Sequence, residues 1–228
     1  PIDNISLDNI ILSSGFWNKR NSVNRQLTIR NAADSCNTSG RISNFRKAAG
    51  QTGYFVGKHT YDDTDVYKVI EAIANTIQLS PNAQLKSRME QFVNYVAEAQ
   101  EDDGYLFTAR TAAAPDAPHP WIGDSRWVNE PFSSYELYDC AYLYRAAIAH
   151  YHATNSTKLL DVAKKNADLL VKVFMDGKLK IESGHQAVET ALTDLYTVTG
   201  EKNYLALSQY LMSLRGTNTS RQNEYNQT

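Results

Sequence analysis

Apolar residues recur along this chain at three- and four-residue spacings, the periodicity of amphipathic helices. Three stretches repeat one plan, in which an apolar helix is followed by a short polar turn and a more amphipathic helix. The stretches are residues 66–99, 143–174 and 187–214, with turns at residues 79–82, 153–156 and 198–201. A helical hairpin with one apolar side cannot bury that side alone. The repeat therefore predicts that the hairpins stack into an array or ring around a shared cavity.

The two helices of each hairpin differ in how much of their surface is apolar. Residues 135–150 are apolar or aromatic nearly all round, which predicts burial on more than one side, as in an inner layer. Residues 161–174 carry charges opposite one apolar stripe and fit an outer layer. Because no run of residues favours a long strand, we predict an all-α fold.

The segments outside the hairpins give weaker signals. Residues 1–14 alternate apolar and polar positions, which indicates a short extended segment, and residues 16–33 follow a helical pattern. Residues 34–65 hold four glycines and many polar side chains, and we predict a long irregular region there. Four prolines within residues 107–132 indicate a second long loop. Loops of this length inside a compact domain are usually functional.

Composition narrows the function classes. The chain has 228 residues, is 42% hydrophobic and carries a formal net charge of −2, so we expect one soluble domain over residues 1–228. This charge gives no reason to expect nucleic acid or an anionic membrane as a partner. No stretch approaches the roughly 20 apolar residues that span a bilayer. Cys36 and Cys140 have no metal-site spacing, and we expect buried free thiols.

Polar and titratable residues gather where the first helix of each hairpin begins. They are Asp63 and Asp65, Tyr135 and Glu136, and His185 and Glu189. Capping of free helical N–H groups explains one of the acids near residue 64, and His185 could simply cap or pack. The alternative is contact with a ligand, in which His185 hydrogen-bonds a ligand hydroxyl. The recurrence of such pairs at one topological place favours a ligand site.

The candidate chemistry stays open at this level. Glycoside hydrolysis ordinarily needs two carboxyl groups about 5–10 Å apart, and spacing alone cannot pair the available acids. The acidic residues 62–65 lack the glycine and the terminal glutamate of an EF-hand loop. Motifs for nucleotide binding and metallopeptidases are absent from the sequence. The 14 tyrosines suit stacking on sugar rings, although tyrosine is also ordinary core material.

An ordered set of motifs resembles the bacterial β-L-arabinofuranosidase family, glycoside hydrolase family 127. The motifs are Phe16-Trp17-x-x-Arg20, Asn24-Arg25-x-x-Thr28-Ile29, Gly40-Arg41-Ile42-x-Asn44-Phe45-Arg46-x-Ala48-Ala49-Gly50, Asp63-x-Asp65-Val66-Tyr67-Lys68, Ala99-Gln100-Glu101-x-Asp103-Gly104-Tyr105-Leu106, Tyr135-Glu136-Leu137-Tyr138, Ala149-His150-Tyr151, Gly184-His185 and Tyr196-x-Val198-Thr199-Gly200. They follow the family's order and cover nearly the whole chain.

The resemblance implies an (α/α)6 barrel, of which this chain would form about half. It implies a zinc-bound cysteine nucleophile and a glutamate acid/base, because zinc keeps a thiolate deprotonated. In the family these residues lie in a region that would follow Thr228. We therefore expect no catalytic residue and no metal ligand in this chain, and zinc only in the complete family domain. The resemblance also points to the bacterial cytoplasm or periplasm without choosing between them.

The resemblance also implies part of a sugar subsite. His185 matches a family histidine that contacts the sugar, Tyr135 replaces another such histidine, and Tyr142 replaces a usual Gly-His pair. A phenol can hydrogen-bond a hydroxyl but titrates near 10 rather than near 6.5. The substrate-contacting residues that we predict are His185, Tyr135, Tyr142, Asp63, Asp65, Arg41 and Glu189.

The sequence thus predicts the N-terminal part of a family-127-like glycoside hydrolase that binds an arabinofuranose-type or related sugar. Alone, the chain is expected not to hydrolyse sugars. Two alternatives are a non-catalytic carbohydrate-binding module and a helical-repeat interaction scaffold. An open hairpin array exposes an apolar edge, which further sequence, a second copy or a protein partner would cover.

Overall fold

The computed structural model describes residues 9–11, 13–113 and 120–215, and these residues form helices and loops without a β-strand. In chain order the helices are α1 (Gly15–Val23), the π-helical turn η2 (Asn24–Thr28), α2 (Ile29–Thr38), α3 (Arg41–Ala48), α4 (Asp63–Leu79), α5 (Ala83–Glu98), α6 (Thr108–Thr111), α7 (Glu136–Thr154), α8 (Lys158–Leu170), the π-helical turn η3 (Val171–Asp176), α9 (Val188–Thr199) and α10 (Lys202–Leu214). The all-α prediction is confirmed.

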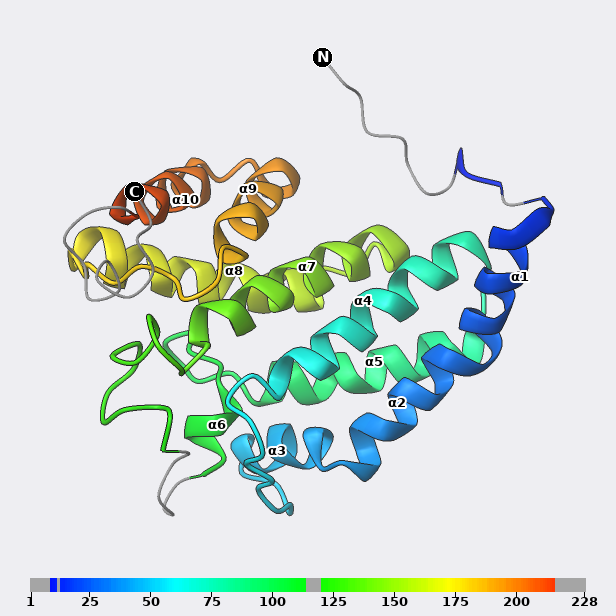
Figure 1. The fold of residues 1–228 in the computed structure, drawn as a ribbon, viewed down its shortest axis with the longest axis horizontal. Helices are drawn as coiled ribbons and strands as arrows, with labels where there is room; N and C mark the ends of the chain where they lie inside the picture. Colours follow the sequence, from blue (N-terminus) through cyan, green and yellow to red (C-terminus); the bar gives the residue numbers. More distant parts are fainter. Residues whose placement is uncertain (1–8, 12, 114–119, 216–228) are drawn as a thin grey trace.

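The three predicted hairpins are α4 with α5, α7 with α8, and α9 with α10, and each turns where the sequence pattern indicates. Helices α4, α7 and α9 pack side by side in that order, and α5 contacts α8 behind them (Figure 1). The first helices of the hairpins thus form one layer and the second helices begin another. This is the hairpin array that the repeat predicts.

Burial follows the apolar pattern of each helix. Helix α4 buries Val66, Ile70 and Ile73 completely. Helix α7 lies between α4 and α9 and buries eleven of its nineteen residues, as its nearly all-round apolar surface predicts. The turn between α4 and α5 is fixed by Asn82, whose side chain accepts a hydrogen bond of 3.0 Å from the backbone N–H of Leu85.

The prediction of an irregular region over residues 34–65 is wrong for its first part. Helix α2 continues to Thr38, and α3 follows after Gly40, which adopts a left-handed conformation with φ of 86°. These helices bury Cys36 and Phe45 in the common core. Gly40 joins two helices, whereas the pattern of glycines suggested a continuous loop. Within residues 34–65, only residues 39–40 and 49–62 lack helix.

The other segments agree with the prediction in part. The helical pattern over residues 16–33 corresponds to α1, η2 and the start of α2. The predicted loop over residues 107–132 contains the short helix α6, and residues 114–119 lie outside the described part. The extended segment predicted for residues 1–14 falls largely on residues that the structure does not describe.

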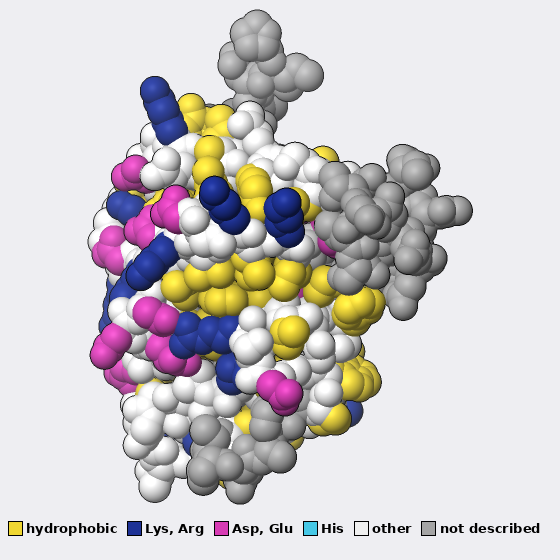
Figure 2. Space-filling view, turned by 90° about the vertical axis from the view of Figure 1, so that its left-hand side faces the viewer, with side chains coloured by type: hydrophobic (Ala, Val, Ile, Leu, Met, Phe, Trp, Pro, Cys, Tyr) yellow, Lys and Arg dark blue, Asp and Glu magenta, His cyan; other side chains and the backbone are white. Residues whose placement is uncertain are grey.

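Two surfaces of the array remain open. Helix α1 lies at the outer end of the array (Figure 1) and buries no residue. Phe16 and Trp17 on it are 61% and 70% exposed. On the face at the left of Figure 1, hydrophobic side chains form a band bordered by charged ones (Figure 2). That a partner or a second copy covers an open edge of the hairpin array stays a prediction. In the described part of the chain, no helix is long and apolar enough to cross a membrane.

Candidate sugar-binding site

Five aromatic side chains meet where the inner helices begin; we call them the aromatic cluster. They are Tyr61, Tyr135, Tyr138, Tyr142 and His185. The ring centroids of Tyr135 and His185 are 5.1 Å apart in a stacked arrangement, and Tyr61 packs edge-on against Tyr135 at 5.2 Å. Tyr138 lies 5.2 Å from His185 and 4.8 Å from Tyr142. Residues from the approaches to α4, α7 and α9 therefore form one continuous aromatic surface.

Lys68 of α4 brings a positive charge to this surface. Its ammonium lies 4.2 Å from the centroid of the Tyr142 ring and 5.2 Å from that of Tyr138, within the range of cation–π attraction. It also donates hydrogen bonds to Thr64 Oγ1 at 3.1 Å and to the Tyr138 hydroxyl at 3.3 Å. A hydrogen bond with Tyr138, followed by burial, raises the pKa of the Tyr142 phenol. The phenol therefore remains protonated at neutral pH.

The backbone at the start of α7 is strained. Tyr135 adopts a left-handed conformation with φ of 61°, which is uncommon for a bulky residue and costs about 1–3 kcal/mol. Neighbouring hydrogen bonds hold it there. The adjacent Glu136 carboxylate accepts from the Tyr105 hydroxyl at 2.6 Å, from the Trp127 N–H at 2.7 Å and from the Ser134 hydroxyl at 2.8 Å. Strain held by such a network is typical of functional positions.

A second buried acid joins the start of α7 to the segment before α9. Glu130 accepts hydrogen bonds from the backbone N–H of Leu137 at 3.1 Å and of Gly184 at 3.2 Å. Complete burial, and then the charge of Glu136, raise the pKa of Glu130 to about 8. Glu130 thus fixes the spacing between the residues that precede His185 and those that follow Tyr135.

The predicted site residues fall into three groups. Tyr135, Tyr142 and His185 lie together in the aromatic cluster. Arg41 and Asp65 form a partly exposed pair at the start of α4, with Arg41 Nε 3.0 Å from Asp65 Oδ2, and Arg41 also pairs with Asp62 at 2.9 Å.

Asp63 and Glu189 form the third group and are buried. The Asp63 carboxylate accepts hydrogen bonds from the N–H and hydroxyl of Thr108, and burial raises its pKa to about 7. Glu189 accepts from the hydroxyl of Ser183 at 2.9 Å and pairs with Arg215 at 3.1 Å. These contacts tie helices together, so the structure supplies a supporting role for both acids.

Sequence reasoning missed Lys68, Tyr138 and Tyr61 as members of the site. A signal for Tyr138 was present, because Tyr135, Tyr138 and Tyr142 are spaced by three and four residues and so share one face of α7. A signal for Lys68 was its position one helical turn after Thr64, which places the two side chains on the same face of α4. Tyr61 lies before α4, and only the packing of the helices shows that it meets Tyr135.

The thiols and carboxylates of the described residues do not fit a zinc site. Both cysteines are buried and free, and burial raises the pKa of Cys36 to about 11 and that of Cys140 well above its ordinary value. Among the described residues, no group of three or more histidine, cysteine, aspartate or glutamate side chains could hold a metal ion.

The arrangement suits a ligand that is rich in hydroxyl groups. Phenol hydroxyls and the imidazole can both donate and accept hydrogen bonds, and the ammonium of Lys68 donates. The aromatic faces offer apolar surface for the C–H faces of a ring.

Residues 9–228 match the family described as β-L-arabinofuranosidase, GH127 catalytic domain. The non-reducing end β-L-arabinofuranosidase of Bifidobacterium longum subsp. longum is 37% identical over 182 residues, which cover 77% of this chain and 26% of that protein. A solved GH127 β-arabinofuranosidase superposes with a TM-score of 0.90 at 38% identity, over 97% of this chain and 35% of the other.

The GH127 β-L-arabinofuranosidase of Geobacillus stearothermophilus T6 superposes with a TM-score of 0.85 at 33% identity, over 96% of this chain and 35% of the other. The chain thus spans 26% of the curated relative and 35% of the solved ones. The match extends over nearly every helix described above. The chain belongs to the GH127 β-L-arabinofuranosidase family and corresponds to its N-terminal part.

Proposed function

We propose that this chain forms part of the sugar-binding site of a GH127 glycoside hydrolase, with the aromatic cluster as the surface that contacts the sugar. One observation carries the proposal: three inner helices bring phenols, an imidazole and the Lys68 ammonium to one surface. The relatives are named β-L-arabinofuranosidases, which makes a β-L-arabinofuranosyl group the first ligand to test.

Each residue has a proposed role. Tyr138 and His185 hydrogen-bond ring hydroxyls, and Tyr135 supplies an apolar face. Lys68 holds the Tyr138 hydroxyl in place and donates a further hydrogen bond to the sugar. Arg41 and Asp65 form the rim. The buried acids Asp63 and Glu189 position the helices.

We further propose that the chain binds the sugar without hydrolysing it. Two buried carboxyl groups that support the start of α7 are engaged within the protein: Glu136 accepts three hydrogen bonds, and Glu130 accepts from two backbone amides. Asp139, next to Tyr138 on α7, is buried with 1% of its surface exposed. General acid/base catalysis needs a carboxyl group that reaches the glycosidic oxygen. Release of the aryl group from an aryl β-L-arabinofuranoside by the purified chain would overturn this part of the proposal.

Binding is tested by calorimetric titration with methyl β-L-arabinofuranoside. Tyr138→Phe removes one hydroxyl and keeps the ring, and we expect it to weaken binding by roughly fivefold, the effect of one lost hydrogen bond. The matched control is Tyr151→Phe, at the other end of α7, which should bind as the wild type does. A lack of saturable binding at millimolar sugar, or an equal loss in both variants, would contradict the proposal.

A further inference from the structure

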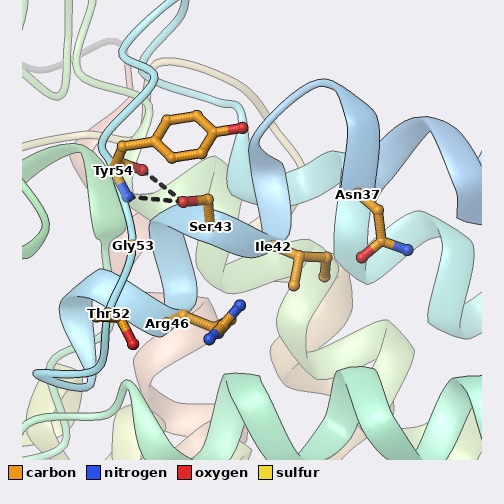
Figure 3. A pocket seen from close by; sticks show the side chains of 7 residues that line it. All are labelled: Asn37, Ile42, Ser43, Arg46, Thr52, Gly53 and Tyr54. Carbon is orange, nitrogen blue, oxygen red and sulfur yellow. Dashed lines mark hydrogen bonds between the residues drawn. The ribbon is translucent and has the colours of Figure 1, made fainter.

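A hollow lies on a part of the surface that includes none of the residues of the aromatic cluster. It has a volume of about 460 Å³ and is bordered by the end of α2, the first turns of α3 and the loop after α3 (Figure 3). Asn37, Ile42, Arg46 and Tyr54 line it from different sides. This volume falls in the range of small-molecule sites, which is about 300–1,000 Å³.

The loop on one side of the hollow is pinned to α3 by two successive residues. The Ser43 hydroxyl donates to the Tyr54 carbonyl at 2.7 Å and accepts from the Tyr54 N–H at 2.9 Å. The Asn44 side chain binds the backbone of Val56 in the same two-sided way, at 3.1 Å and 2.8 Å. A Cβ on Gly40 would meet Val56 Cγ2 at 2.5 Å, so the loop lies directly on the start of α3.

This pinned loop presents an exposed aromatic ring. Tyr54 is 60% exposed although its backbone is held on both sides. Its ring borders the hollow above Ser43 and Ile42 (Figure 3). Preorganisation of this kind lowers the conformational entropy that a ligand must remove on binding. A rigid loop that exposes a tyrosine therefore provides a ready stacking surface.

The hollow also holds donors that make only long hydrogen bonds, such as the one of 3.5 Å from the Asn37 amide to the Ala33 carbonyl. The Arg46 guanidinium makes one long hydrogen bond of 3.5 Å to Gln51 and lies 6.0 Å from the Tyr95 ring. Within the described residues it has no carboxylate partner. The Thr52 hydroxyl and the Asn37 amide border the same space. The Tyr54 ring offers an apolar face that matches the C–H face of a sugar. The planar guanidinium of Arg46, together with the amide and the hydroxyl, can hydrogen-bond the hydroxyl groups of that sugar.

We propose that this hollow is a second carbohydrate-binding site, which takes one sugar unit of a longer arabinofuranosyl saccharide. The proposal rests on the proposed function, because that function supplies the ligand class. Helix α3 connects the two sites: it begins with Arg41 at the rim of the first site, and it carries Ser43 and Arg46 into the hollow. Tyr54 supplies the stacking face and Arg46 the hydroxyl-binding fork.

The test is a titration of the 15N-labelled chain with a β-L-arabinofuranosyl trisaccharide, followed by NMR of the backbone amides. We expect the signals of Gly53 and Tyr54 to move and to saturate. Tyr54→Ala should weaken this response by about tenfold, as the loss of one anchoring aromatic does in many interfaces. The matched control is Trp17→Ala, which removes another exposed ring, on α1, and should leave the response unchanged.

The two sites can fail separately. If Tyr138→Phe weakens the binding of the methyl glycoside to the cluster but leaves the Tyr54 response to the trisaccharide intact, both proposals stand. If the methyl glycoside does not bind while the Tyr54 response persists, the proposed function is wrong and the second site stands. Three results would overturn the second site: no movement of residues 52–54, an equal response in Tyr54→Ala, or the same shifts with glycerol.

Discussion

Asp63→Asn tests whether the carboxyl at the start of α4 is a buried, protonated structural group. Its two oxygens accept hydrogen bonds from the N–H and the hydroxyl of Thr108, which begins α6, and only 2% of the residue is exposed. An asparagine can keep both contacts. Its oxygen accepts from the N–H, and its amide donates to the hydroxyl, which can also accept. The substitution therefore removes the ionisation and keeps the shape.

The magnitude follows from the pKa. Burial raises the pKa of Asp63 from 3.8 to about 7 in the folded protein. Between these values the folded state holds a proton that the unfolded chain has lost, so the stabilisation present below pH 3.8 disappears as the pH rises to about 7. Each pH unit between the two pKa values lowers the unfolding free energy by about 1.4 kcal/mol. Over about three pH units, the unfolding free energy of the wild type therefore falls by about 4 kcal/mol, a loss that D63N does not show.

The assay is urea unfolding, followed by helical circular dichroism, for the wild type and D63N from about pH 4 to about pH 8. Burial also raises the pKa values of Glu130 and Glu136, which contribute to both proteins. Burial and then the charge of Asp63 raise the pKa of Asp139, so the difference between the two proteins reports Asp63 together with its coupling to Asp139. We expect the unfolding free energy of D63N, relative to that of the wild type, to rise steadily across this pH range. A difference that stays constant with pH would refute the reasoning.

Three further predictions concern packing and thiols. Phe92→Ala on α5 removes a ring with no exposed surface, and the unfolding free energy should fall by about 3–5 kcal/mol in urea titrations. Tyr204→Phe deletes the 2.9 Å hydrogen bond from α10 to Asp168 on α8 and should cost about 1 kcal/mol, visible as a lower Tm. Because burial raises the pKa values of Cys36 and Cys140, a disulfide reagent at mildly alkaline pH should label both thiols only after unfolding; rapid labelling of the native chain would contradict this.

Local pattern was enough for much of the fold. The hairpins, their turns and the buried position of α7 follow from periodicity, because the spacing of apolar side chains decides which face of a helix can be buried. The same logic failed at residues 34–48. There Gly40 marks a turn between two short helices, and the polar residues of α2 and α3 hid the continuation of the apolar stripe from Ile29 and Ala33 to Cys36.

The candidate site was only half visible in the sequence. Tyr135 and His185 could be found because both precede the inner helices of a repeat, and repeated units place their helix starts on one side. The sequence could not separate the buried acids Asp63 and Glu189 from the residues of the aromatic cluster. All of them occupy the same topological place, and only burial and hydrogen bonding show that these two acids face the protein.

The sequence by itself determined the helices, their pairing into hairpins and the family, since these depend on side-chain spacing along one chain. Tertiary structure decided which side chains meet. Lys68 and Tyr138 come from different helices, and the backbone of Tyr54 is held by Ser43, eleven positions earlier. Contacts between distant segments depend on how the helices are packed and rotated, and spacing within one helix does not contain that information.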